Sequence, residues 1–323
     1  MAQGYGHKGW IGVGRETTWG TRVAPTVFER PIEESMKLNQ SQLPLPSLGT
    51  AGQYRSVASR RFVDGGFKFY AGFNGMIGVL LNDAIGDASS AQVDASSAYD
   101  HTINPDSDLP VGLSIQCSRD AANIGTAYDY EGCQIESLTL RQSNEAPLEV
   151  EVAFQGEEET KQSEATESFA TLYQIDYSML TVQVNSVAQN VKEFEVTIAN
   201  NLATDRGNLG SRLRPGIGRG SGPREVSGSM LIEFDDVTEY DLFRDLTEVP
   251  IVATWAAPAN AIESGYTYNL AITMSQCYLE GPPDIGMKDG GPLMLPVDFR
   301  AFCTTADNDE ITAVLRNTDT SII

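Results

Sequence analysis

The sequence has few of the residues that catalytic and metal sites most often use. Its 323 residues include two histidines and four cysteines. The cysteines are Cys117, Cys133, Cys277 and Cys303. They form no CxxC pair and have no histidine at ligand spacing, so a zinc site is not expected. His7 and His101 are isolated, and no spacing rule ties a serine or cysteine to either of them. We therefore expect no cofactor and no enzymatic activity.

Basic residues are also scarce. There are 22 Lys and Arg against 44 Asp and Glu, a formal net charge of −22. A chain this acidic gains little from neutralising phosphates, which disfavours sequence-reading DNA binding. No apolar run approaches the roughly 18 to 20 residues of a membrane span. Residues 1–10 lack the basic and apolar regions of a signal peptide. These features predict a soluble protein of intracellular origin, with 41% hydrophobic residues to form a core.

The remaining motifs are weak. Gly4–Gly9 has the letters of G-x-G-x-x-G, but no strand precedes it and no amphipathic helix follows it, so a dinucleotide site is not expected. The acidic turns 106–108 and 307–310 do not match an EF-hand loop and are more often solvated than bound to calcium. Cys117 and Cys133 are close enough in sequence for a β-hairpin to bridge, and whether they bond stays open.

Short alternating runs dominate the chain and predict β-strands. In Leu148–Phe154 the apolar residues occupy every second position, the pattern of a half-buried strand. The expected strands are 115–119, 134–140, 148–154, 180–184, 194–198, 229–234, 268–274 and 293–299. The fold class is therefore mainly β.

Two helices are expected. The first is Asn74–Ile85, which is rich in apolar residues. The second is Asp236–Thr247, where Asp236 and Glu239 have the spacing of a capping box. Its apolar residues recur every three positions and are expected to face the core. They are Val237, Tyr240, Phe243 and Leu246.

The two helices belong to an apparent internal repeat. Residues 63–69 align with 226–232 at an offset of 163, and 147–154 align with 292–299 at an offset of 145. An insertion in the first half, around residues 87–100, accounts for the difference. The sequence thus predicts a tandem duplication, with one domain at 1–175 and a second at 176–323. The alternative is chance recurrence of a β pattern.

Two long loops are expected at equivalent places, Pro44–Arg61 and Leu202–Arg224. They carry a group of arginines that we expect to contact another subunit. These are Arg55, Arg60, Arg61, Arg206, Arg212, Arg214, Arg219 and Arg224. Arginine suits bidentate pairing with carboxylates, and residues 149–167 supply an acidic surface. A basic arm and an acidic face on one chain favour self-stacking. The alternatives are solvated loops or a nucleic-acid contact, although 205–224 has no aromatic residue for stacking on bases.

The N-terminal segment carries a resemblance to a known family. Residues 12–21 read GVGRETTWGT, and Pro25, Pro31 and Glu34-Ser35 follow. This stretch resembles the start of the major tail tube proteins of long non-contractile-tailed (siphovirus-type) bacteriophages, and residues 63–86 fit the same pattern.

The resemblance implies tail-tube-like β-sandwich domains, each with one flanking helix and a long loop between early strands. It also implies a structural virion protein that self-assembles into stacked rings. The tube would be assembled in the host cytoplasm alongside other phage tail proteins, and genomic DNA would pass through its lumen without specific binding. Rings of six single-domain subunits are usual in that family. A duplicated chain would close a pseudo-six-fold ring with three copies, or six copies would assemble.

An acidic lumen is consistent with the composition, because a DNA conduit should repel phosphate. The alternative functions are another β-sandwich virion component (a capsid decoration, minor tail or head-tail joining protein) or a ligand-binding module.

Overall fold

The computed structural model describes residues 4–46, 48–49, 51–53, 55–218, 220, 222–235, 237–259, 261–281, 292–303 and 309–322. The structure is mainly β, with nineteen antiparallel strands and three short α-helices among these residues. The elements of the N-terminal half are η1 (Gly6–Lys8), β1 (Trp10–Arg15), β2 (Val27–Glu29), β3 (Glu33–Glu34), β4 (Lys37–Leu45), β5 (Arg55–Tyr70), α1 (Met76–Ile85), β6 (Gly86–Gln92), β7 (Tyr99–Pro105), β8 (Leu113–Ser118), α2 (Ala121–Ile124), β9 (Ala127–Ser143), β10 (Glu149–Gly156) and β11 (Glu158–Gln162). Those of the C-terminal half are η2 (Tyr177–Met179), β12 (Leu180–Val184), β13 (Val187–Gln189), β14 (Val191–Ala199), β15 (Glu225–Glu233), α3 (Thr238–Arg244), β16 (Val249–Ala256), β17 (Asn269–Glu280), β18 (Met294–Ala301) and β19 (Thr312–Asn317).

All eight predicted strands lie on strands of the structure, which confirms the mainly β fold class. Alternation is the physical reason. On β10, Val150, Val152 and Phe154 are buried, while Glu149 and Glu151 point to the other side of the sheet. A one-residue shift in pairing would exchange these two sets, so burial fixes the register.

The two predicted helices differ in outcome. The first is confirmed, because α1 ends at Ile85 as predicted and nine of its ten residues are buried. The second is shorter than predicted, since α3 covers only Thr238–Arg244 and none of its residues is buried. Asp236 lies outside the described residues. Glu239 accepts a hydrogen bond from the side chain of Gln189 on β13 (2.8 Å), and the capping box itself stays a prediction.

Only part of the apolar stripe of this second helix faces the core, where Phe243 packs against it. Val237 and Leu246 are 57% and 70% exposed, and Phe243 is only half-buried. Spacing by three residues drifts around an α-helix, so residues nine apart lie on opposite sides. The prediction was therefore wrong for Val237 and Leu246.

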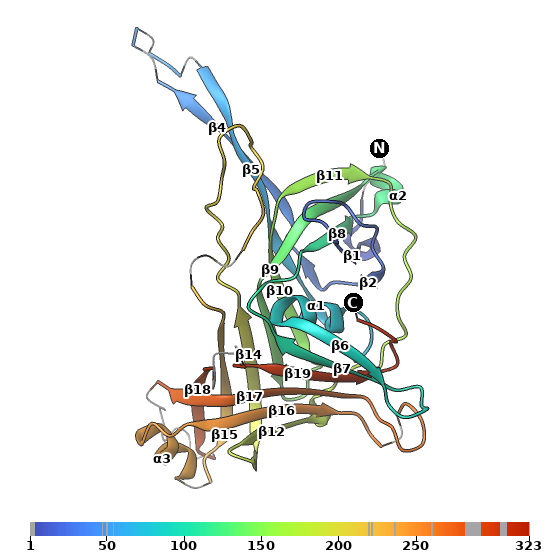
Figure 1. Cartoon of the computed structure of the whole chain (residues 1–323), viewed down its shortest axis with the longest axis vertical. Helices are drawn as coiled ribbons and strands as arrows, with labels where there is room; N and C mark the ends of the chain where they lie inside the picture. Colours follow the sequence, from blue (N-terminus) through green and yellow to red (C-terminus); the bar gives the residue numbers. More distant parts are fainter. Residues whose placement is uncertain are drawn as a thin grey trace.

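One sheet runs through both halves of the chain (Figure 1). Its central strand order is β4-β5-β10-β9-β14-β15-β18, followed by the last residues of β17. The halves meet where β9 pairs with β14 over seven residue pairs, from Glu193↔Ser143 to Ala199↔Ser137. We call this pairing the seam.

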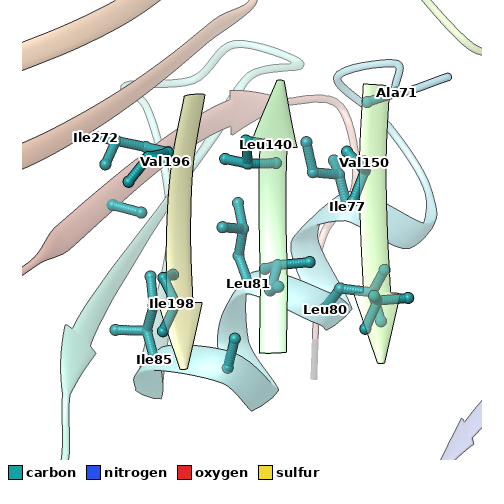
Figure 2. Close-up of a cluster of buried hydrophobic side chains, with 14 of the residues drawn as sticks. Ala71, Ile77, Leu80, Leu81, Ile85, Leu140, Val150, Val196, Ile198 and Ile272 are labelled. Carbon is teal, nitrogen blue, oxygen red and sulfur yellow. The ribbon is translucent and has the colours of Figure 1, made fainter. Parts of the chain in front are cut away.

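Helix α1 covers the buried side of the seam. Figure 2 shows Ile77 near Val150 of β10, Leu80 farther along the same strand, Leu81 beside β9, and Ile85 near Ile198 of β14. All of these side chains are at most 1% exposed. The hydrophobic core is therefore continuous across the two halves.

The strand pairings of the two halves correspond. β9 pairs with β8 and β11 through its first part and with β10 through its second. In the same way, β17 pairs with β16 and β19 through its first part and with β18 through its second. Even the register agrees, because the pair Phe154↔Gly65 is matched by Phe299↔Gly228 at the sequence offsets of 145 and 163. Residues 87–100, predicted as an insertion, lie in the hairpin β6–β7, which pairs with β19 of the other half.

The segment Pro44–Arg61, predicted as a loop, is mostly strand. The ends of β4 and β5 form a long hairpin that projects from the body of the protein (Figure 1). Most of its residues are exposed, apolar ones included, so the sequence lacks the buried alternation that reveals a strand, and cross-strand hydrogen bonds hold it instead. The second predicted loop, Leu202–Arg224, has no strand among its described residues except an isolated bridge at Leu202.

The close contact at Gly228 gives a stability prediction. A Cβ atom on this residue would lie 2.4 Å from Cζ of Phe299 and 2.3 Å from the carbonyl oxygen of Glu195. We expect Gly228→Ala to lower the free energy of unfolding by about 1 to 3 kcal/mol, measured by urea denaturation. Ser229→Ala, at the exposed neighbouring position, is the matched control and should change it little. Equal stability of the two variants would contradict this account of the packing.

Candidate self-assembly surfaces

The solvent face of the central sheet is a continuous acidic surface. Residues paired directly across strands share a face, and one such row runs Lys68, Glu151, Thr139, Thr197, Ser227 and Arg300 across both halves. The acidic side chains on this face are Glu33, Asp64, Glu136, Glu149, Glu151, Glu193, Glu195, Glu225, Glu233, Glu280 and Asp298. We call this surface the acidic sheet face.

The basic side chains on this face are each paired with a carboxylate. The pairs are Lys37–Asp64 (3.5 Å), Lys68–Glu151 (3.0 Å), Arg141–Glu195 (2.5 Å), Lys192–Glu233 (3.3 Å), Arg300–Glu225 (2.6 Å) and Arg300–Glu280 (3.3 Å). Carboxylates outnumber cations, so the face carries net negative charge. The sequence picked out Glu149 and Glu151 but not the rest, although acids at the polar positions of alternating strands were the available signal.

The seam is held on both sides of the sheet. On the acidic sheet face, the hydroxyls of Thr139 and Thr197 are hydrogen-bonded (2.9 Å), and Arg141 pairs with Glu195. On the buried side, Leu140 pairs with Val196 in the ladder under α1. The seam thus joins β9 and β14 through polar contacts on one face of the sheet and apolar contacts on the other.

The central sheet has an open edge at each end. β3 and β4 pair with β5 on one side, and no described strand pairs with their other side. At the far end, residues 278–280 of β17 pair with β18 on one side only. Open edges are templates for pairing with another chain.

The hairpin β4–β5 and the loop 202–224 lie side by side (Figure 1). Backbone N–H of Arg61 donates to the carbonyl of Arg212 (2.9 Å), and Nε of Arg212 donates to the carbonyl of Ser59 (3.0 Å). Arg60 donates to the carbonyls of Asp205 and Arg206. The two segments form one projecting unit, which we call the arm.

The arginines predicted for inter-subunit contact differ in their exposure to solvent. Arg55, Arg206 and Arg212 are exposed on the arm, and Arg60 and Arg61 are half-buried there. Arg214 is buried over the ring of Phe62, with its guanidinium carbon 4.7 Å from the ring centroid. Arg219 lies outside the described residues.

Arg224 sits inside the protein rather than on a contact surface. Its side chain is 1% exposed, pairs with Glu310 and donates to the carbonyl of Ile85 at the end of α1. Arg61 pairs with Glu158 at the start of β11. Part of the expected pairing between arginines and acidic residues therefore takes place within one copy.

The N-terminal motif has a structural role. Glu16 is buried, and its carboxylate accepts hydrogen bonds from the backbone N–H of Gly20 (2.8 Å), the hydroxyl of Ser114 (2.8 Å) and the backbone N–H of Gly132 (2.9 Å). It ties the segment after β1 to β8 and β9. Replacing an acceptor of three buried bonds would leave donors unpaired.

The described chain also holds buried thiols and a buried histidine. Cys117 and Cys133 are free thiols, and burial raises the pKa of each well above its usual range. The buried imidazole of His101 lies within hydrogen-bond distance of Ser90 (2.7 Å) and Asn317 (2.8 Å). Within the described residues, no three His, Cys, Asp or Glu side chains are grouped to hold a metal ion. Residues 307 and 308 of one predicted acidic turn lie outside them.

The described chain thus presents open sheet edges, a charged sheet face and a projecting arm. The family model described as phage tail tube protein matches residues 6–301. The chain therefore belongs to the phage tail tube protein family, whose members are structural components of the virion tail and not enzymes. A comparison with curated protein sequences found no match. None of the described helices is both long and apolar enough to cross a membrane.

Asp83 on α1 is buried without a hydrogen-bond partner, 3.9 Å from Nε of Arg15. Burial raises its pKa to about 7 from the ordinary 3.8, and Arg15 only partly opposes this. Between these two pH values the folded chain holds a proton that the unfolded chain releases. Stability contributed by this group therefore falls as pH rises through that window.

We expect Asp83→Asn to be as stable as the wild type near pH 4 and more stable at pH 8, by up to roughly 4 kcal/mol. The asparagine side chain mimics the protonated carboxyl and cannot ionise. Urea denaturation of both proteins at several pH values measures the difference, in which contributions from other groups cancel. Parallel stability curves for the two proteins would show that Asp83 is ionised at little cost.

Proposed function

We propose that the chain assembles with copies of itself into rings, and that stacked rings form the phage tail tube. The observation that carries this proposal is the seam between β9 and β14. Two halves with corresponding strand pairings are joined edge to edge within one chain, while β3–β4 and the end of β17 are left as open edges. Pairing of these edges between copies would repeat the same junction around a ring and remove exposed sheet edges.

The acidic sheet face would line the lumen. Rings joined through the central sheet continue this face from copy to copy, so its carboxylates would surround the passage. Negative charge repels DNA phosphates over a Debye length of roughly 8 Å at physiological salt. Genomic DNA would therefore pass without specific binding.

Three copies would close one ring. Each half contributes four strands to the central sheet, and the matched register at Phe154↔Gly65 and Phe299↔Gly228 supports a tandem duplication. The repeat units would be 1–175 and 176–323, and three chains would give pseudo-six-fold symmetry. A ring of six chains is the competing stoichiometry.

The arm would contact the next ring. It projects beyond the body of the protein and exposes Arg55, Arg206 and Arg212, so it can contact an acidic surface of another copy. It also exposes large apolar side chains that could be buried on docking. These are Leu43, Leu45, Leu48, Val57 and Leu209. Other tail proteins would start and end the tube, and assembly would take place in the host cytoplasm.

Electron microscopy of the purified protein at low and high concentration tests the proposal. We expect concentration-dependent rings or hollow tubes, because edge pairing is a mass-action process. Light scattering on the smallest closed assembly should give three chains. Six chains would contradict the three-copy ring, and a monomer at all concentrations, also when mixed with preformed tail tips, would contradict self-assembly.

Charge reversal on the arm tests stacking. We expect Arg206→Glu with Arg212→Glu to keep the fold and the rings but to shorten or abolish tubes, since both residues are exposed on the arm. The matched control is Lys8→Glu with Lys161→Glu, which changes the net charge equally at exposed positions away from the arm. Tube length is measured by electron microscopy, and normal tubes from the arm variant would rule out this contact.

A further inference from the structure

The ends of α1 and α3 lie in different surroundings, although the helices occupy equivalent places in the two halves. Residues 81–85 at the end of α1 are all buried. The equivalent residues at the offset of 163 are 244–248, and all of them are exposed. Helix α3 ends at Arg244, and Leu246 beyond it is 70% exposed. In the described chain, other residues therefore cover the end of α1, whereas none cover the end of α3 in the same way.

Two side chains from the C-terminal half cover the end of α1. Nδ2 of Asn200 donates to the carbonyl of Ala84 (3.2 Å) and to that of Ile135 (3.0 Å). The guanidinium of Arg224 donates to the carbonyl of Ile85. The last carbonyls of a helix lack partners within it, and a cation near them is favourable. The pair Asn200 and Arg224 thus caps α1 across the seam.

Gln40 and Arg61 are the equivalents of this pair in the N-terminal half. Gln40 and Arg61 are paired in the β4–β5 ladder. Asn200 and Arg224 adjoin the last pair of the β14–β15 ladder, Ala199↔Glu225. The equivalence extends to the ion pairs. Arg61 binds Glu158 at the start of β11, and Arg224 binds Glu310 just before β19. Nε of Arg61 is buried without a partner. Gln40 is exposed at the open edge.

We propose that Gln40 and Arg61 of one copy cap the C-terminal end of α3 of the adjacent copy in the ring, and that this contact covers Leu246. The inference rests on the proposed ring assembly. The acceptors would be the carbonyls of Thr247 and Glu248, the equivalents of Ala84 and Ile85. The same repeat brings Gln40 to the carbonyl of Leu279, the equivalent of Ile135, at the open end of β17.

Charge and position are consistent with this contact. The carboxylates of Asp245 and Glu248 lie just beyond the C-terminal end of α3, where an arginine from another copy is favourable. Glu248 accepts hydrogen bonds from Gln276 (2.5 Å) and Tyr278 (3.3 Å) of β17, so this end of α3 lies beside the edge that would receive β3–β4. Helix cap and sheet edge would be engaged together when a ring closes.

The first test is Leu246→Lys, which places a cation opposite Arg61 at an exposed position. We expect an unchanged melting temperature of the unassembled chain and loss of rings by electron microscopy and light scattering. Val111→Lys is the matched control, since Val111 is 43% exposed in the N-terminal half, on the segment that precedes β8. It should form rings. Normal rings from Leu246→Lys would overturn the inference and leave the proposed function intact, whereas absence of rings from the wild-type chain would overturn the proposed function itself.

The second test detects the contact directly. Gln40→Cys and Thr247→Cys are combined in a Cys303→Ser background, because Cys303 is the exposed native thiol. A short bis-maleimide added to assembled rings should give covalent oligomers up to the ring stoichiometry on a denaturing gel. Each single-cysteine protein should stay monomeric. Rings that yield no covalent oligomer would overturn the inference.

Discussion

The antiparallel pairing of β9 with β14 is the interaction on which the rest of the structure depends. It turns two half-sheets into one, gives α1 a surface to cover, and places the polar residues of both halves on a common face. The core continues across this pairing, because α1 belongs to the first half and its Ile85 lies near Ile198 of the second. Burial of that apolar surface is the main stabilising contribution at the junction.

The distribution of charge on the protein follows from the positions of its few basic residues. Arg61 and Arg224 bind Glu158 and Glu310 inside their halves, and the cations of the acidic sheet face are each matched to a carboxylate. Such pairs neutralise the basic residues locally. The large negative balance of the chain therefore resides in unpaired surface carboxylates, which keeps the face negative without a concentrated basic site.

The sequence predicted those elements in which local pattern and tertiary burial agree. Strand β10 and helix α1 were found because alternation or apolar density matches their burial. The hairpin β4–β5 was missed because its exposed polar strands show no such pattern. The cap of Asn200 and Arg224 on α1 joins residues more than a hundred positions apart, and Arg224 was assigned to a surface because charge alone does not report burial. The edges and the acidic sheet face depend on strand order, which no single segment encodes.

The arm and α3 stand at opposite ends of the long axis of the molecule (Figure 1). A subunit shaped in this way has no twofold relation between its two ends, so copies stacked through the arm must all point in one direction. Such a polymer is polar. In the proposed tube, one end would present arms and the other the surfaces that receive them, so the proteins that begin a tail and those that finish it would face chemically different terminal rings.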